Sequence, residues 1–552
     1  MKEQDAINHA KYEKSGGRIF DAVYGYIELN TAEFELVNSP IFQRLHWIKQ
    51  LGPLHTVFPS AQHSRFSHTL GVFYIVKKMI AHLSDRFEKD GSGYKFNDND
   101  KEAEVLRFAA LLHDIGHVPL SHVGEEVLKN AAQEEIKAKQ KSVNSRGAIN
   151  VFKYQEPSWW ILFPEKEYRG DHTKLHERLS AEIVLHNEEI DKALNMVWPD
   201  PKQREEAKKK MAQIIVGKDE TNVPTLLLHS ELDADRIDYL LRDSFFTGVG
   251  YGKIELDYII SRLCIHRGKD GVAILCVEDK GLHTIEHYIL GRFFLQTQVI
   301  FNRKVRLMDL LFADVMEYMV KAGEKRDWGV MKLQQVRYHI RSGKGKNKRD
   351  HLHAIYKYTD AEVFGKMRQL HEQLDYGEKK RKAATEERYI NDCIKIIMDG
   401  RIDNPVITDQ KIIDLKRRPD YKKTLEEEAN KIKTKVAKKN KIFHKRINVN
   451  IVEQEVMKYR KRREAKDDKL QEVNREAVKI RDKTGNDQYK WMFAAESNAT
   501  ILRGLHDKAL LILNIYYIPS KTNAGAEEYR KKVEESIKQG FDEFVTKHFK
   551  GK

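Results

Sequence analysis

Histidine is concentrated in the first quarter of this 552-residue chain, where eight of the 23 histidines lie between His46 and His122. Imidazole nitrogens and carboxylate oxygens together form metal sites that suit iron, manganese, zinc or magnesium better than ions that prefer sulfur. Three segments carry both groups: His63-Ser-Arg-Phe-Ser-His68, His113-Asp114-Ile-Gly-His117-Val-Pro-Leu-Ser-His122 and Glu231-Leu-Asp233-Ala-Asp235-Arg236-Ile-Asp238-Tyr239. Together they predict a divalent metal ion that activates water beside a substrate.

The spacing of these groups restricts how they can share one ion. Neighbouring residues of a helix point about 100° apart, so His113 and Asp114 can bind the same ion only if it lies beyond the helix end, as the following Gly116 allows. His117 comes one helical turn after His113. Asp235, which lies more than a hundred residues later on another helix, would complete four ligands and leave positions open for water.

Each segment alone has a simpler interpretation. A His-Asp dipeptide often occurs by chance, and His63 fits a capping or supporting role better than that of a ligand. Asp233 and Asp238 could be solvated, or paired with Arg236 and Arg242. The metal-site hypothesis therefore depends on the combination of the three segments.

Helices must position these groups. Proline (12 residues) and glycine (31 residues) are scarce for this length, which predicts a mainly α fold. Apolar residues at three- and four-residue spacings predict helices over 64–83, 102–113, 225–242 and 285–311. Two apolar runs, 262–266 and 273–277, flank Gly-Lys-Asp-Gly and predict a small β-hairpin.

The character of the sequence changes near residue 320, which divides the chain into two predicted domains. Residues 1–320 are predicted to form a helical core, and residues 321–552 a charged C-terminal helical lobe. In the lobe we predict an exposed basic loop at 341–349, helices over 355–400 and 420–485, and a folded segment over 486–549. The window 401–480 holds 24 basic and 14 acidic residues, so it supplies +10 of the net charge of +15. This excess fits either a polyanionic partner, such as nucleic acid, or a solvated helical face.

Composition excludes several classes of protein. With 41% hydrophobic and 33% charged residues, the chain is expected to fold as a water-soluble globular protein. Its apolar runs are too short to cross a bilayer, and its polar N-terminus lacks a secretory signal. Three widely spaced cysteines fit neither a disulfide scaffold nor a cysteine zinc finger, so a reduced, cytoplasmic location is expected.

The ordered motifs resemble the HD-domain phosphohydrolases, and more narrowly the deoxynucleoside triphosphate triphosphohydrolases typified by the sterile-alpha-motif-and-HD-domain protein. The resemblance runs from about Phe20 to Val305. Its motifs, besides the three segments above, are Asp21-Ala-Val-Tyr-Gly, Ser39-Pro-Ile-Phe-Gln-Arg-Leu, Ile48-Lys-Gln-Leu-Gly and Phe58-Pro. It implies an HD-domain helical core that uses a divalent metal (Fe, Mn, Mg or Zn) to hydrolyse a dNTP to deoxynucleoside and inorganic triphosphate.

Residue by residue, the resemblance implies a set of roles. The metal ligands would be His68, His113, Asp114 and Asp235. His117, His122 and His176 would line the phosphate site, where Glu125 would hold His122, the candidate acid for the departing 5′ oxygen. The residues that contact phosphate or nucleotide would be Arg65, Arg236, Tyr239 and Arg292, and those that contact the sugar Gln50 and Asp243.

The sequence departs from the family pattern at two places. Ile300 stands where the family has a tyrosine that packs on the sugar, and Asn302 and Arg303 replace a histidine and a lysine, which bears on sugar selectivity. At the family's regulatory guanine-nucleotide site Gln43 is retained, whereas Asn38 and His46 replace an aspartate and an arginine. These changes argue against activation by the same guanine nucleotide and leave regulation by another nucleotide open.

Three functions follow as hypotheses. The first is hydrolysis of dNTPs. The second is hydrolysis of another phosphoryl substrate, such as a cyclic nucleotide, a guanosine alarmone, a nucleoside monophosphate or a single-stranded nucleic acid that binds the basic lobe. The third is a nucleic-acid-binding scaffold with a residual metal site. The resemblance also implies a homo-oligomer, a dimer or tetramer, with nucleotides bound between its subunits.

Overall fold

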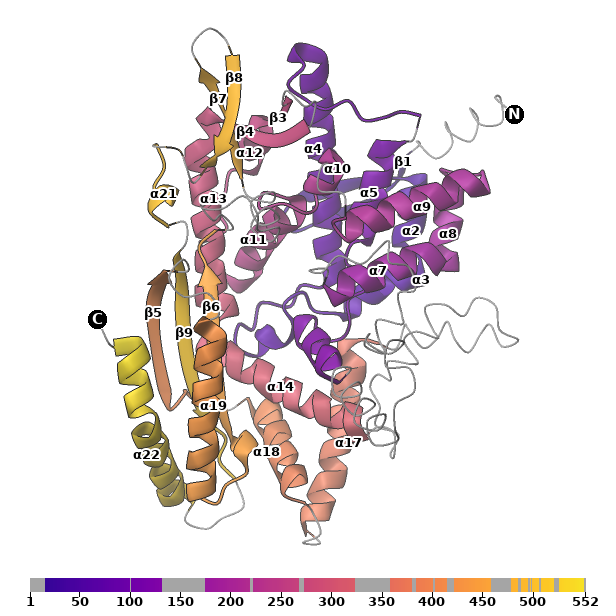
Figure 1. Cartoon of the computed structure of the whole chain (residues 1–552). Helices are drawn as coiled ribbons and strands as arrows, with labels where there is room; N and C mark the ends of the chain where they lie inside the picture. The colour runs from indigo at the N-terminus through magenta and orange to yellow at the C-terminus, as the bar shows by residue number, and fades with distance from the viewer. Residues whose placement is uncertain are drawn as a thin grey trace, which may run out of the picture.

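The structure, a computed structural model, describes residues 15–550 apart from 100, 132–173, 219–221, 268–272, 323–357, 380–383, 401–402, 415–420, 458–477, 485–487, 495–496, 498, 506–507 and 521–525. The fold is mainly α, as predicted, and small sheets accompany the helices (Figure 1). The predicted basic loop at 341–349 and the turn of the predicted hairpin lie outside the described residues. Within the described ranges, no helix combines the length and the apolar character needed to cross a bilayer.

The first helices of the core carry two of the chemically interesting segments. The first described elements are the hairpin of β1 (Ser15–Asp21) and β2 (Gly25–Asn30), followed by α2 (Thr31–Val37) and α3 (Pro40–Gln43). The predicted helices over 64–83 and 102–113 are confirmed as α4 (Arg65–Asp90) and α5 (Glu102–Leu112). α4 buries the predicted stripe of apolar residues, Val72, Ile75, Val76, Met79 and Leu83.

The third segment begins a helix rather than lying within one. α9 (Pro201–Ile215) packs on both α5 and α7 (Leu175–His186), and α8 (Glu188–Asn195) lies between α7 and α9 in the chain. The prediction of one helix over 225–242 is wrong, because α10 (Val223–Leu226) and α11 (Ala234–Thr247) are separate. Asp233 caps α11, since its carboxylate accepts a hydrogen bond from the backbone N–H of Arg236 at 2.7 Å.

The predicted hairpin is confirmed and belongs to a larger sheet. After α12 (Leu256–Arg262), β3 (Leu263–Arg267) pairs antiparallel with β4 (Ala273–Glu278). Two strands from near the C-terminus, β7 (Lys479–Thr484) and β8 (Gln488–Phe493), extend this sheet in the order β3-β4-β7-β8. β7 pairs parallel with β4, so a segment from the C-terminal part of the chain returns to the sheet of the core.

The long helix predicted over 285–311 is interrupted. α13 (Leu282–Leu295) continues as a π-helix over Gln296–Ile300, and α14 (Arg303–Ala322) begins after a break at Phe301 and Asn302. α18 (Thr385–Asp399) packs on both α14 and α17 (Asp360–Lys379). The hydrophobic core that contains α4 and α5 also includes residues from Tyr358 to Ile397. The predicted domain boundary at 320 stays a prediction, although the main core continues past it.

A second hydrophobic core is formed by a C-terminal sheet and two helices, and these elements lie beside one another in Figure 1. β5 (Ile407–Asp414), β9 (Lys508–Tyr517) and β6 (Ile447–Glu455) form an antiparallel sheet in the order β5-β9-β6, and α19 (Tyr421–Lys439) and α22 (Ala526–Val545) contribute to its core. The helix predicted over 420–485 is wrong after Lys439, because β6 and β7 follow. The alternation Ile447-Asn-Val-Asn-Ile451 has the period of two that a half-buried strand requires.

Candidate active site

Three predicted metal ligands meet where α5 ends. His113 is the residue that caps the C-terminus of α5, Asp114 follows it, and His68 comes from the first turns of α4. Asp114 Oδ2 lies 3.6 Å from His68 Nε2, and Asp114 Oδ1 lies 3.5 Å from His113 Nε2. Ligand atoms about 2.1 Å from one ion are roughly 3–4 Å apart. The three side chains are therefore spaced as ligands of a single divalent ion.

The environment of these atoms also fits a metal. The Nε2 atoms of His68 and His113 are buried and have no hydrogen-bond partner. Such atoms are costly unless a partner or an ion satisfies them. Asp235, the fourth predicted ligand, approaches from the first turn of α11, and its Oδ1 lies 3.1 Å from His68 Nε2. Asp235 is 32% exposed, so it lies on the open side of the cluster.

Gly116 and the Ser180 hydroxyl shape the turn that holds this cluster. A Cβ on Gly116 would overlap the backbone of α7 at Ser180 and His176, so only glycine allows this close approach. The hydroxyl of Ser180 donates to the His113 carbonyl at 2.7 Å and accepts from the Gly116 N–H at 2.9 Å. These contacts fix the position of α7, and with it His176, relative to the His-Asp pair.

A buried carboxylate contacts Nδ1 of His68, the ring nitrogen that does not face the other predicted ligands. Asp238 Oδ2 lies 2.7 Å from His68 Nδ1, and the Arg242 guanidinium contacts both Asp238 oxygens at 2.9 and 3.0 Å. Arg242 in turn donates to Asp21 at 2.7 Å, and the Tyr24 hydroxyl donates to Asp238 at 2.7 Å. The alternative that Asp238 is paired with Arg242 is thus correct, but the pair is buried and supports His68.

Carboxylates change the protonation of the cluster. Burial lowers the pKa of His68, but the nearby carboxylates of Asp235 and Asp238 outweigh burial and raise its pKa to about 10. Burial lowers the pKa of His113. Burial raises the pKa of Asp114, but the charges of Arg65, His113 and His117 lower it by more than burial raises it. The net pKa is therefore well below its usual range. Without an ion, a proton therefore resides on His68.

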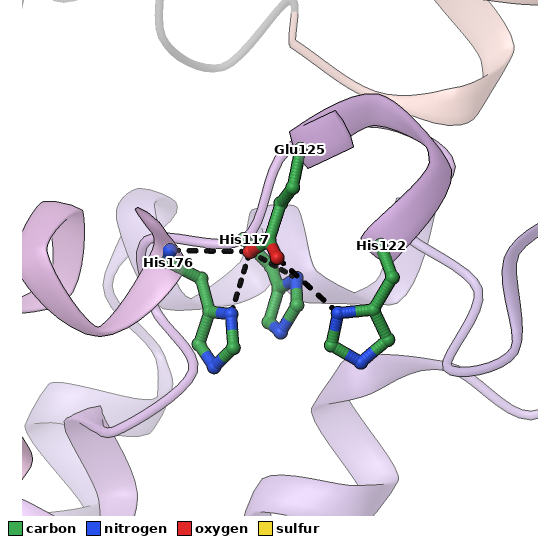
Figure 2. Close-up of side chains that lie close together, drawn as sticks. All are labelled: His117, His122, Glu125 and His176. Carbon is green, nitrogen blue, oxygen red and sulfur yellow. Dashed lines mark hydrogen bonds and ion pairs between the residues drawn. The ribbon is translucent and has the colours of Figure 1, made fainter. Parts of the chain in front are cut away.

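A second cluster surrounds Glu125, the carboxylate on the helix over 122–131 (Figure 2). Glu125 Oε1 lies 2.5 Å from His176 Nδ1 and 3.6 Å from His117 Nδ1, and Glu125 Oε2 lies 3.2 Å from His122 Nδ1. The rings of His117 and His176 stack with centroids 3.9 Å apart. Because three Nδ1 atoms face one carboxylate, Glu125 orients all three imidazoles. Catalytic and metal-binding histidines are commonly oriented by a carboxylate in this way. Their ligand atoms are also close enough together to hold a metal ion.

The three histidines differ in their tendency to carry a proton. Burial lowers the pKa of His176, but the charge of Glu125 and the hydrogen bond to it outweigh burial, so the net pKa is raised. The pKa of His117 is well below its usual range because of burial and the nearby Arg65. Desolvation lowers the pKa of His122 despite Glu125, although water still reaches 64% of its side chain. In this arrangement His176 is the better proton carrier.

Asp114 joins the two clusters. Its Oδ1 lies 3.4 Å from His117 Nε2 and 3.9 Å from His176 Nε2. Its Oδ2 lies 2.6 Å from Arg65 Nη1. Arg65 is buried and also donates to the Ser121 hydroxyl at 3.2 Å, which places a fixed cation beside both clusters.

A large cavity of about 1330 Å³ opens in front of these residues. It is lined by ten of the residues predicted for the site: Gln50, Arg65, His113, His122, His176, Asp235, Arg236, Tyr239, Asp243 and Arg292. The remaining predicted ligands and phosphate-site residues, His68, Asp114, His117 and Glu125, do not line it and lie behind its wall. Part of its lining comes from β6, in a segment predicted to be helical.

Several lining residues are engaged with other protein groups. Asp243, a predicted sugar contact, lies 2.8 Å from His63 Nε2, so His63 has a supporting role, as expected. Arg292 Nη2 lies 2.5 Å from a Glu231 oxygen. Arg236 donates to the Asp233 carboxylate, which confirms the predicted pair. These contacts hold two cations, Arg236 and Arg292, at the cavity wall.

The residues predicted for a regulatory site lie away from the cavity. Gln43 Nε2 donates to the Val37 carbonyl at 2.9 Å, and Asn38 ends α2. The His46 ring stacks on Phe66 with centroids 3.6 Å apart. Each is explained by packing in a single chain, so their regulatory role stays a prediction.

Sequence reasoning missed Asp360 and the pairing of Asp21 with Arg242, which connect distant segments to the site. Each is a charged side chain that is largely buried and hydrogen-bonded. The motif Asp21-Ala-Val-Tyr-Gly did point to Asp21, but not to its pairing with Arg242. No spacing in the sequence indicates Asp360.

Comparison with known proteins finds a family match for the segment that carries the four predicted metal ligands. A family model described as HD domain matches residues 65–243. The protein named "Uncharacterized protein YwfO" of Bacillus subtilis is 28% identical over 298 residues, which is 54% of this chain and 54% of that protein. Deoxynucleoside triphosphate triphosphohydrolase SAMHD1 of Bos taurus is 25% identical over 309 residues, 54% of this chain and 46% of that protein. This chain thus spans about half the length of the curated relatives it matches.

A solved structure shares the fold over most of the chain. The crystal structure of a phosphohydrolase from Bacteroides thetaiotaomicron superposes with a TM-score of 0.56 at 20% sequence identity and covers 91% of this chain and 99% of that one. This likeness establishes a common fold. The HD-domain match and the SAMHD1 homologues confirm the family resemblance that the motifs predicted.

Proposed function

We propose that this HD-domain protein is a metal-dependent phosphohydrolase that converts dNTPs to deoxynucleoside and inorganic triphosphate. The observation that carries the proposal is the convergence of His68, His113 and Asp114 beside a cationic cavity. The HD domain and the dNTP-hydrolysing homologues support the general class of reaction. A divalent ion held by these residues and Asp235 would lower the pKa of water and polarise a phosphoryl oxygen.

The chain's own residues account for the binding of a polyanion. A triphosphate carries roughly four negative charges, and Arg65, Arg236 and Arg292 all line the cavity near the histidines. The planar guanidinium group can bind two phosphate oxygens at once. The α-phosphate would then lie next to His113, which lines the cavity, with the sugar towards Gln50 and Asp243.

The Glu125 cluster supplies the proton for the leaving group. Attack at the α-phosphorus breaks its bond to the 5′ oxygen, which leaves as an alkoxide unless it is protonated. His176 holds a proton next to Glu125 and lines the cavity, so it serves as the acid or passes its proton to His122. A positioned acid typically contributes about 10²–10⁴ in rate.

The test is a nucleotide panel in water enriched in ¹⁸O. Each dNTP and NTP, singly and in mixtures, is incubated with protein of measured metal content, and the products are identified by mass spectrometry. We expect deoxynucleoside and triphosphate, with the heavy oxygen only in triphosphate. Release of diphosphate or phosphate would indicate another nucleotide hydrolase. The proposal would be refuted if the wild type released no product from any nucleotide and so did not differ from the inactive control Asp114→Asn.

The same assay tests the competing substrate. A labelled oligonucleotide is included because the cavity exceeds the roughly 300–1,000 Å³ typical of small-molecule sites. Release of mononucleotides from the oligonucleotide, with no hydrolysis of dNTPs, would favour a nuclease. Regulation by a nucleotide and assembly into dimers or tetramers are part of the proposal, and light scattering with and without dNTPs tests the assembly.

A further inference from the structure

The turn that presents His122 has an unfavourable backbone conformation. Leu120 and Ser121 have φ angles of 58° and 52°, in the left-handed region that side-chain-bearing residues rarely adopt. Two consecutive residues of this kind persist only where surrounding contacts hold them. The turn leads directly into the helix over 122–131, and the Glu125 N–H donates to the Ser121 carbonyl at 3.1 Å. The turn therefore sets the position of both His122 and Glu125.

A carboxylate from a remote helix holds this turn. Asp360, the first residue of α17, accepts the Leu120 N–H at 2.7 Å with Oδ1 and the Lys49 N–H at 2.9 Å with Oδ2. It is 5% exposed. The Ser121 hydroxyl donates to the Lys49 carbonyl at 2.7 Å, which closes the connection between the two segments that Asp360 joins.

The segment at Lys49 is itself part of the site. Lys49 pairs with Ser64 in an isolated β-bridge, and the Arg65 N–H donates to the Ile48 carbonyl at 2.9 Å. Gln50, the next residue, lines the cavity. One carboxylate thus fixes the turn before His122 relative to the start of α4, which carries Arg65.

A second connection runs beside the first. Arg44 donates to the Tyr358 carbonyl at 2.9 Å, two residues before Asp360. The same guanidinium donates to the carbonyls of Ile115 and His117 at 2.7 and 2.9 Å. The start of α17 is therefore tied to both ends of the segment that runs from the His-Asp pair to His122.

We propose that Asp360 is a positioning residue that holds the His122 and Glu125 turn in its working geometry and so makes hydrolysis depend on the helices after residue 320. The catalytic part of this inference rests on the proposed function. Asp360 touches none of the predicted metal ligands, so its role is separate from metal binding. It acts through backbone N–H groups, which explains why no motif marks it.

The protonation of Asp360 allows a second test of the proposal, in which the pH is varied. Burial raises its pKa to about 6, although the two backbone N–H donors and the charges of Lys49 and Arg65 oppose this rise. A protonated carboxyl keeps one good acceptor and presents an O–H to the other N–H. The connection should therefore weaken as the pH falls through about 6.

The decisive variant is Asp360→Asn, which keeps the shape and removes one acceptor. We expect kcat to fall by roughly 10- to 100-fold, because a misplacement of about 1 Å has such effects, with KM and metal content close to wild type. Glu362→Gln, in the same first turn of α17, is the matched control and should retain wild-type kcat. A folded Asp360→Asn variant with kcat within twofold of wild type, or with its metal lost, would overturn the proposal.

Hydrogen exchange separates this inference from the proposed function. In Asp360→Asn, amides over 118–125 should exchange roughly tenfold faster than in wild type, whereas those of α4 should not change. Hydrogen exchange needs no substrate. If the wild type shows no activity, the proposed function is refuted, and the exchange over 118–125 still tests the positioning role. Unchanged exchange over 118–125 would refute the positioning role.

If Asp360→Asn does not fold, the pH dependence of kcat in the wild type tests the proposal. The proposal expects kcat to fall as the pH decreases through about 6 at constant metal content. A kcat that stays level from pH 7.5 to pH 5 would overturn it.

Discussion

Replacing Asp238 by asparagine changes only one charge, yet this side chain accepts from four donor atoms. These are His68 Nδ1 at 2.7 Å, Arg242 Nε and Nη2 at 2.9 and 3.0 Å, and the Tyr24 hydroxyl at 2.7 Å. An amide offers one acceptor oxygen and turns an NH₂ group towards donors. About two of the four donors therefore lose their acceptor, in a place that water does not reach.

The magnitude follows from two estimates that agree. Hydrogen bonds to a charged group contribute about 1.5–3 kcal/mol each, so the loss of two costs about 3–6 kcal/mol. Breaking a buried ion pair from one side costs about 3–5 kcal/mol. Arg242 keeps Asp21 as a partner at 2.7 Å, which favours the lower part of the range. We expect Asp238→Asn to lower the free energy of unfolding by about 3 kcal/mol.

Metal affinity provides the second measurement. Asp238 orients His68, and loss of such a supporting carboxylate typically weakens metal binding by about 10- to 100-fold. Urea unfolding at neutral pH and calorimetric metal titration measure the two effects. Asp85→Asn is the control: it breaks an exposed pair with Lys89 at 2.8 Å on α4, the helix that carries His68, and should cost less than about 1 kcal/mol. Wild-type stability and metal affinity in Asp238→Asn would refute the reasoning.

Three further outcomes follow from the two clusters and their packing. His176→Ala should lower kcat by about 10²–10⁴ while metal content stays constant; a loss of metal would show instead that the Glu125 cluster holds an ion. Metal binding at pH 7.5 should release about one proton, because the metal-free pKa of His68 is about 10 and a ligand must lose its proton; calorimetry in buffers of different ionisation enthalpy counts it, and zero protons would contradict the assignment. Gly71→Ala should destabilise by about 1–3 kcal/mol in thermal unfolding, since its Cβ would overlap Asp238 and Arg242, whereas Gly365→Ala, with open space around its Cβ, should not; equal effects would refute this packing argument.

The sequence predicted those parts of the fold that repeat over short distances. The stripe of α4 and the end of α5 at His113 are local patterns, and so they could be read directly. The grouping of His68, His113 and Asp114 followed from residue types and a family resemblance. Continuation of a helix through 227–233 was predicted wrongly because Leu228 and Leu232 fit a helical stripe, while the capping by Asp233 decides where α11 begins.

Other features depend on contacts that no local pattern encodes. β6 was missed because the charged residues before and after it suggested one long helix, although Ile447 to Ile451 alternate with a period of two. Asp360 is an acidic residue at a helix start, which usually interacts with its own N-terminus. Here it binds Leu120, 240 residues away, because burial against the turn removes the competition from water.

The shared position of Asp114 decides which substitutions can separate the two clusters. Its Oδ2 contacts Arg65 while its Oδ1 faces both His113 and His117, so Asp114→Asn would alter the metal site, the fixed cation and the imidazole stack at once. Its loss of activity would not identify a step. His113 and His176 each belong mainly to one cluster, so their single and double substitutions can be compared. If the clusters act in one chemical step, the losses of kcat should be far from additive, because either change alone removes most of that step's acceleration. If the two losses instead multiply, the clusters act independently, and Asp114 joins them in structure only.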